Sequence, residues 1–349
     1  MQIRMIANQK EIKQTNKTAL EERGINFDIG VPVTSSVSLK ETIVVGFGDG
    51  TLRFFEKDLN PRVVKAHKGV VLCMATNGDS IFTGGDDGKF LKVSLTGDIQ
   101  EIKDFETRWV DCVATYKGDM VCSSGSTAYI WSKGQDKPKS LDHTSTVGGL
   151  AFSSNGKYLA VSHYGGVTVW ERLERRWKSS KYIWKGSHGL VSFSPDNRYL
   201  VTAMQENELH AWRLRDKDNL KMSGYPAKIK SFAWIGDTPH LATSGANEAI
   251  CWPFDIKGPK GRKPVCVADG GKQYSTYIQS FPGEEAVFAG FLDGTVLLSE
   301  LNEQKKANII RHATGSEVSA IAVTSNRSHI LIGDAKGNVL WSSLWAGEI

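Results

Sequence analysis

Histidine and cysteine are the residues of this chain whose side chains could bind a metal or act as bases and nucleophiles. The eight histidines show no HxH or HExxH spacing, and the five cysteines show no CxxC pair, so neither type has the pattern of a zinc site. The cysteines lie in apolar segments, where a free thiol behaves as a small buried hydrophobe. We therefore predict no catalytic residue, no cofactor and no metal. The residues considered are His67, His143, His163, His188, His210, His240, His312, His329, Cys73, Cys112, Cys122, Cys251 and Cys266.

Two short turns could contact a ligand through glycine or aromatic residues. The run Gly84–Gly88 has the composition of a phosphate-binding loop, but no helix follows it, so a tight β-turn is the better interpretation. His163 and Tyr164 lie in another turn, from which they could either reach a central channel or face solvent. The GxSxG, P-loop and GxGxxG motifs do not occur in a suitable strand–helix context, so these hydrolase and nucleotide-binding signatures are missing.

Two basic stretches could bind a polyanion. Residues 172–185 interleave Arg and Lys with Trp and Tyr, which suits base stacking and phosphate contact. The same pattern suits an outer strand whose aromatic rings pack inward and whose cations face water, and the nearby Glu171 and Glu174 favour that interpretation. The second stretch, Lys257–Pro264, contains Gly and Pro and is predicted to be an inserted loop. It is either a functional loop or a solvated insertion.

The composition is that of a soluble globular protein. Of the 349 residues, 40% are hydrophobic and 23% are charged. No apolar run is long enough for a membrane span, and the N-terminus lacks the apolar core of a secretory signal. A net charge of +5 is too small to indicate a dedicated nucleic-acid binder. The odd, dispersed cysteines exclude a disulfide framework and indicate a reducing compartment, so we expect a cytoplasmic protein.

A repeat of about 40 residues organises the chain. Each copy has a short strand that ends in small residues, a tight turn and a second strand that ends mostly in an aromatic residue. The eight copies are 42–55, 80–93, 120–131, 158–170, 199–212, 240–252, 286–299 and 329–341. Their closing residues, Phe55, Val93, Trp131, Trp170, Trp212, Trp252, Ser299 and Trp341, follow one another at intervals of about 38 to 47 residues.

Each copy is flanked by two further predicted strands. A strand of small and apolar residues precedes it, as in 71–76 and 319–324, and a strand rich in Lys and Arg follows it. The basic strand suits the outer edge of a sheet, where it faces water. Four antiparallel strands per copy, repeated radially, form the blades of an all-β propeller. The eight copies predict eight blades, with seven as the alternative if one copy lies outside the ring.

The repeats resemble a known family. The segments AFSSNGKYLAVSHYGGVTVW (151–170) and SFSPDNRYLVTAMQENELHAW (192–212) look like WD40 repeats, and several copies follow a family-like histidine. The resemblance covers about residues 30–343 and implies a WD40 propeller, in the style of stand-alone bacterial ones. It also implies structural roles for the family-like histidines, which are His67, His143 and His312.

The family's polar network joins a His, a Ser or Thr, an Asp and a Trp within each blade, and no copy here keeps all four. The second copy lacks the tryptophan, and the fourth has Tyr164 near the aspartate position. The residues that do match are His67, Thr83 and Asp87 in the second copy and His143, Ser162 and Trp170 in the fourth. We therefore expect weaker hydrogen-bond stiffening of the blades than in close family members.

The two chain ends are predicted to complete one sheet. After Trp341 too few residues remain for a full outer strand. As in WD40 proteins, the N-terminal stretch, residues 10–28, is expected to supply that strand and pair beside residues 340–344. The whole chain, 1–349, is then a single propeller domain.

The resemblance implies a non-catalytic scaffold that binds a protein or peptide on one face of the ring. That face would carry the turns between second and third strands and the connections that enter each first strand, where aromatic residues and Arg make good anchors. The candidate residues are Phe47, Asp86, Arg108, Trp109, Tyr164, Trp184, Gln205, Asn247, Tyr274 and Phe291.

Two other functions are alternatives to this one. A propeller enzyme of the hydrolase or lactonase type would need acids or histidines at one inner position of several blades, whereas the inner strands carry mainly Cys and Ser. A nucleic-acid-binding propeller would depend on residues 172–185. We predict a monomer that is not an enzyme, binds no nucleic acid or membrane, and has an unidentified protein or peptide as its partner.

Overall fold

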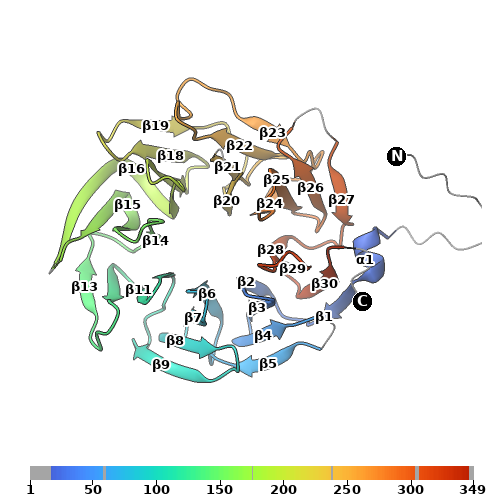
Figure 1. The fold of residues 1–349 in the computed structure, drawn as a ribbon, viewed down its shortest axis with the longest axis horizontal. Coiled ribbons are helices and arrows are strands. Elements are labelled where there is room, and N and C mark those ends of the chain that lie inside the picture. Colours follow the sequence, from blue (N-terminus) through green and yellow to red (C-terminus); the bar gives the residue numbers. More distant parts are fainter. Residues whose placement is uncertain (1–16, 58–59, 175, 237–238, 303–305, 346–349) are drawn as a thin grey trace, which may run out of the picture.

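Short antiparallel strands surround a central axis in the computed structural model (Figure 1), which describes residues 17–57, 60–174, 176–236, 239–302 and 306–345. These residues form thirty strands and one short helix, α1 (Ala19–Arg23). The prediction of an all-β propeller is confirmed. Among the described residues, no helix has the length and hydropathy needed to cross a bilayer.

Six of the seven sheets have the predicted four antiparallel strands. The second strand of each is largely buried, and β3, β7 and β25 are buried at every residue, because neighbouring sheets cover both of their faces. In sheet order, the strands are β2 (Val33–Leu39), β3 (Thr42–Phe47), β4 (Thr51–Phe55) and β5 (Arg62–Lys65); β6 (Val71–Thr76), β7 (Ser80–Gly85), β8 (Lys89–Ser94) and β9 (Ile99–Asp104); β10 (Val113–Tyr116), β11 (Asp119–Ser124), β12 (Thr127–Trp131) and β13 (Lys139–Asp142); β20 (Phe232–Ile235), β21 (His240–Thr243), β22 (Ala249–Pro253) and β23 (Val265–Val267); β24 (Ser275–Ser280), β25 (Ala286–Phe291), β26 (Val296–Glu300) and β27 (Asn308–Arg311); and β28 (Val318–Val323), β29 (His329–Asp334), β30 (Asn338–Ser343) and β1 (Ile25–Asp28).

The seventh sheet has six strands and contains both the fourth and the fifth repeat. Its long strand β15 includes the second and third strands of the fourth repeat, and the two ends lie side by side because the Arg172 amide donates to the Lys157 carbonyl (2.8 Å). The strand β16 continues from the last strand of the fourth repeat into the first strand of the fifth. The six strands are β14 (Gly149–Phe152), β15 (Tyr158–Arg172), β16 (Trp177–Phe193), β17 (Tyr199–Met204), β18 (Leu209–Arg213) and β19 (Asn219–Met222).

Counted as hydrogen-bonded sheets, the ring has seven blades, so the prediction of eight separate blades is wrong. All eight repeats are in the ring, but the fourth and fifth are joined. A glycine explains the junction: a Cβ at Gly148, just before the first strand of the fourth repeat, would lie 2.2 Å from the carbonyl oxygen of His188, just before that of the fifth. Only glycine allows backbones to approach so closely, and Tyr164 then pairs with Ser187 across the two repeats.

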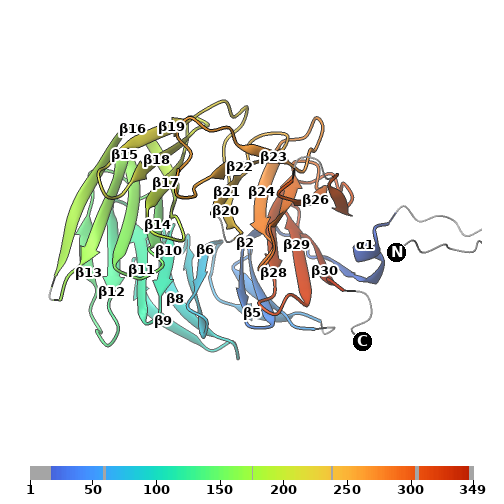
Figure 2. The ribbon, with the colours of Figure 1, turned by 45° about the horizontal axis from the view of Figure 1, so that its top comes forward.

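The ring closes where the N-terminal elements α1 and β1 lie beside β30 (Figure 1), and α1 stands next to β30 in the tilted view as well (Figure 2). Strand β1 is the outer strand of the last sheet and runs antiparallel to β30, with Ile25 opposite Trp341 and Asp28 opposite Asn338. This pairing leaves β30 with a partner on each side. Residues 10–16 of the expected closing segment lie outside the described residues, and the extent of the domain over 1–349 stays a prediction.

The helix α1 strengthens this closure by contacting two neighbouring sheets. Thr18, its N-cap, donates through its hydroxyl to the Ile310 carbonyl at the end of β27 (2.7 Å). Leu20 is buried in a cluster that includes Phe288 and Leu340, and Arg23 donates to the carbonyl of Ser343 (2.7 Å). The N-terminal segment therefore holds the sheets of β27 and β30 together.

Deleting residues 1–30 should lower the melting temperature of the whole ring by at least about 5 °C, because it removes a paired strand and a buried helix face. Deletion of residues 1–16 serves as the matched comparison in the same thermal melts followed by circular dichroism. A 1–30 deletion that melts within a degree or two of the full chain would show that closure does not depend on this segment.

Candidate functional site

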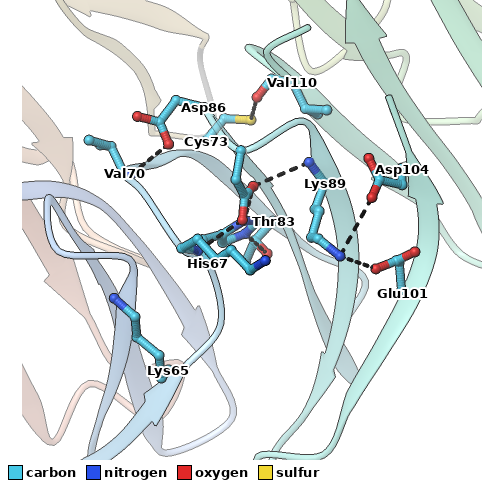
Figure 3. A network of polar contacts seen from close by, with 12 residues as sticks. Lys65, His67, Val70, Cys73, Thr83, Asp86, Lys89, Glu101, Asp104 and Val110 are labelled. Carbon is cyan, nitrogen blue, oxygen red and sulfur yellow. Dashed lines mark hydrogen bonds and ion pairs between the residues drawn. The ribbon is translucent and has the colours of Figure 1, made fainter. Parts of the chain in front are cut away.

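The second repeat builds a three-residue polar network under the turn that carries Asp86 (Figure 3). The Nδ1 of His67 donates to the Asp87 carboxylate (2.8 Å), and its Nε2 pairs with the Thr83 hydroxyl (2.8 Å). Burial alone would raise the pKa of Asp87, but hydrogen bonds from His67 and the Lys68 amide outweigh it and lower the pKa. The network joins the residues that the resemblance implied, and it fixes the turn between β7 and β8.

The fourth and fifth repeats use histidine differently. His143 accepts a hydrogen bond from the Trp170 indole (3.2 Å), whereas Ser162 donates to the carbonyls of Gly149 and Gly189 instead of joining the histidine. In the fifth repeat, His188 pairs through Nδ1 with the Thr202 hydroxyl (2.8 Å). His188 was not among the predicted family-like histidines, which are His67, His143 and His312. His188 does lie just before the first strand of the fifth repeat, as His67 lies just before the first strand of the second repeat.

In the sixth repeat a tyrosine takes the place of the histidine. The Tyr225 hydroxyl lies 2.8 Å from the Thr243 hydroxyl and accepts a hydrogen bond from the Trp252 indole (2.8 Å). Sequence comparison with a histidine pattern misses this substitution. The signal available in the sequence is the position of Tyr225, which stands before the first strand of the sixth repeat, where other repeats have a histidine.

The last repeat replaces the histidine network with an ion pair. The Arg311 guanidinium lies 3.2 Å from the Asp334 carboxylate, and both side chains are buried. Asp334 also accepts hydrogen bonds from Thr314 (3.0 Å) and Asn338 (3.0 Å). His312, which the resemblance placed near this network, instead donates to Glu21 of α1 (2.7 Å) and so takes part in ring closure.

The turns between second and third strands and the connections that enter each first strand lie at one end of the sheets, here called the upper face. Backbone hydrogen bonds join the two kinds of connection, as from Gln205 to the Ser187 carbonyl (3.0 Å) and from Gly270 to the Asn247 carbonyl (2.8 Å). Two predicted residues on this face present large aromatic surfaces to solvent: Trp109 is 58% exposed and Tyr164 is 57% exposed.

The other predicted face residues fall into three groups. Arg108, Gln205 and Asn247 are exposed, and so is part of the Tyr274 side chain. Asp86 accepts a hydrogen bond from the Val70 amide (2.7 Å), so its carboxylate helps to hold the turn. Trp184 stacks on His210, with ring centroids 4.1 Å apart, and is half-buried.

Two of the predicted face residues are wrong. Phe47 and Phe291 are fully buried, because each is the last residue of a second strand and points between two sheets rather than into the turn. Phe47 packs with Phe55 and Trp341, and Phe291 belongs to a cluster with Val287 and Ala289. The repeat pattern predicts both residues to lie in the turn, whereas each is the last residue of the strand before it.

A pocket of about 460 Å³, here called the upper pocket, opens on the upper face where the fourth, fifth and sixth repeats meet. Gln205 and the exposed Leu190 line it, and Tyr164 lies at its edge because it pairs with Ser187 of the lining. Lys228 and Lys230 form another wall, and Lys230 pairs with Glu317 of a distant sheet (2.8 Å). A larger pocket of about 620 Å³ near β23 and β27 includes none of the ten predicted residues.

The aromatic residues of stretch 172–185 are engaged inside the protein. Trp177 lies under the Arg172 guanidinium (4.9 Å), and Arg172 itself pairs with Asp119. Tyr182 is buried and donates to the Leu214 carbonyl (3.2 Å). Arg175 lies outside the described residues. Because these rings already pack on protein, they do not offer the free stacking surfaces that nucleic-acid binding requires.

We predict that Tyr225→Phe destabilises the protein by about 1–3 kcal/mol, because it leaves the Trp252 indole and the Thr243 hydroxyl with one buried partner fewer. Urea unfolding measures this loss. The matched control is Tyr164→Phe, whose hydroxyl lies on an exposed side chain and whose loss should change the unfolding free energy little. Equal stability of both variants would contradict the role of Tyr225.

The buried histidines predict a loss of stability in mild acid. Burial, helped by the neighbouring His163, lowers the pKa of His143 to about 4, and burial with His188 nearby lowers that of His210 to about 4. The unfolded chain binds these protons near the ordinary pKa of about 6.5, whereas the folded protein binds them only near pH 4. The free energy of unfolding is therefore highest above about pH 6.5 and declines as the pH falls toward about 4. Thermal melts across this range should show the decline, and His143→Gln should make it shallower. An unchanged slope in that variant would contradict the assignment.

Comparisons with known proteins agree with this fold. The family model described as WD domain, G-beta repeat matches residues 136–171, which contain the fourth repeat. The chain is 23% identical over 155 residues to Meiotic fizzy-related protein 2 of Schizosaccharomyces pombe, a match that covers 42% of this chain and 30% of that protein. It is 30% identical over 145 residues to the WD repeat-containing protein 26 homolog of Arabidopsis thaliana, covering 37% of this chain and 24% of that protein. The matches thus span less than a third of either relative.

Among solved structures, the crystal structure of the computationally designed Ika8 protein superposes with a TM-score of 0.72 at 18% identity, covering 90% of this chain and 97% of that one. This likeness shows the fold alone. Taken together, the matched repeat, the two relatives and the ring of repeated antiparallel sheets support a WD40-repeat β-propeller family for this chain.

Proposed function

We propose that this protein is a non-catalytic scaffold that binds a protein segment on its upper face. The observation that carries the proposal is the exposure of Trp109 and Tyr164 on connections whose backbones are fixed by hydrogen bonds. The Val110 amide donates to Gly85 (3.1 Å), and the Tyr164 amide donates to the Ser145 hydroxyl (2.9 Å). Large aromatic side chains held rigidly in solvent are typical anchors of protein interfaces.

The upper pocket lies on the same face as these anchors, with Tyr164 at its edge. It combines the aliphatic Leu190, the amide of Gln205 and the exposed cation Lys228, which has no ion pair among the described residues. A mixed lining of this kind suits a peptide side chain with both apolar and polar parts. The described residues bring together no group of three or more His, Cys, Asp or Glu side chains that could hold a metal, so they lend the enzyme alternative no support. Cytoplasmic location and a monomeric state stay predictions from the sequence.

The test is affinity capture from the native host with the wild-type protein, Trp109→Ala, Tyr164→Ala and the control Val63→Ala, which truncates an exposed residue of β5 away from this face. Quantitative mass spectrometry should find proteins that the wild type and control retain and that each aromatic variant loses at least about fivefold, as expected for an interface hot spot. Thermal melts confirm that all variants fold. Partners retained equally by every variant would refute binding through this face.

A further inference from the structure

The inserted loop of the sixth repeat, residues 254–264, has a fixed shape at the opposite end of the sheets, here called the lower face. The Asp255 carboxylate accepts hydrogen bonds from the Lys257 amide (2.9 Å) and the Arg262 guanidinium (2.6 Å). Lys260 reaches across to Asp218 of the fifth repeat (3.2 Å). The sequence left open whether this loop is functional or a solvated insertion, and these contacts show that it is tied to its neighbours.

The loop holds Ile256 in solvent at the edge of a second pocket. Ile256 is 87% exposed, although Phe254 two residues earlier is fully buried and anchors the loop. Gly258 packs so closely that a Cβ there would lie 2.1 Å from the Tyr199 hydroxyl. The pocket, here called the lower pocket, has a volume of about 340 Å³ and is lined by Tyr158, Asn197, Arg198, Tyr199, Arg213, Leu214, Arg215 and Ile256.

The lower pocket and its loop carry an excess of positive charge. Three arginines line the pocket and four further cations lie on the loop, against four aspartates that pair with five of these seven cations. The pairs are Arg198–Asp196, Arg213–Asp216, Arg213–Asp218, Arg215–Asp216, Lys260–Asp218 and Arg262–Asp255. Arg215 is the most available of these cations, since its side chain is 75% exposed and shares Asp216 with Arg213.

We infer that the lower pocket binds an acidic protein segment in which an aliphatic side chain is flanked by carboxylates. The aliphatic group packs against Ile256 and the Tyr199 ring, and the carboxylates pair with Arg215 and Lys260. Exposed Ile256 supplies an apolar contact that stays in water until a partner covers it, and the excess of cations over aspartates selects a partner of negative charge. This surface is separate from the upper face, so the ring has one binding surface at each end of its sheets.

A peptide fits this pocket better than a nucleic acid does. Tyr199 is 6% exposed at the floor of the pocket, so its ring can touch an aliphatic side chain but leaves too little surface for a base to stack on. The aspartates between the arginines would also repel a continuous phosphate backbone, whereas single carboxylates can pair with one cation each.

The test measures binding to the purified full-length protein by fluorescence anisotropy. The probe is a labelled peptide pool that alternates Asp or Glu with Leu, Ile or Val. Pools with Lys or Arg in place of the acids, and a single-stranded oligonucleotide, are the comparison ligands. Ile256→Ser and Arg215→Glu change exposed side chains and should each weaken binding of the acidic pool about fivefold to tenfold. The matched controls are Ile183→Ser, an exposed isoleucine of β16, and Lys139→Glu, an exposed lysine of β13.

Support requires saturable binding of the acidic pool that both pocket variants weaken and both controls retain. Tyr164→Ala should leave this binding unchanged, so failure of the upper-face proposal is distinguishable from failure of this one. The inference is overturned if the acidic pool does not bind, if the basic pool binds as well, or if binding survives both pocket substitutions. Preferential binding of the oligonucleotide, lost in Arg215→Glu, would also overturn it in favour of a nucleic-acid site.

Discussion

Ring closure through β1 and β30 is the interaction on which the other contacts of this propeller depend. Each sheet buries its faces only because a neighbour stands on both sides, so an open ring would expose the apolar second strands at its two ends. The four-residue pairing of Ile25–Asp28 with β30 is short. The helix α1 adds contacts with β27 and β30, which spread the closure over two sheets.

The blades stiffen their turns with different chemical groups at one position. A histidine with Asp and Thr serves the second repeat, a tyrosine with Thr and Trp serves the sixth, and an arginine–aspartate pair serves the last. Each solution gives a buried polar group at least one hydrogen-bond or ion-pair partner, although Nη1 of Arg311 has none among the described residues. The identity of the group is free to vary as long as it pairs with its neighbours, and the weak match to a single repeat pattern follows from this freedom.

Periodicity made the fold predictable, since strand, turn and aromatic closing residues recur at a nearly constant interval whatever the exact residues. The junction of the fourth and fifth repeats was not predictable, because it depends on close backbone approach at Gly148, and a glycine in a connection looks the same in sequence whether or not another chain segment lies against it. Trp109 and Tyr164 are exposed to solvent on their connections. Phe47 and Phe291 are not, because a shift of one residue along a strand reverses the direction of the side chain.

Strand β17 connects the two pockets directly. Its first residue, Tyr199, lines the lower pocket, and its last, Met204, lines the upper one. Five steps of about 3.3 Å separate them, so occupants of the two pockets would be roughly 17 Å apart and would not collide. All six residues of the strand are buried, which makes it a stiff connection between the sites. If filling one pocket shifts this strand, thermodynamic linkage requires that the two ligands change each other's affinity by the same factor.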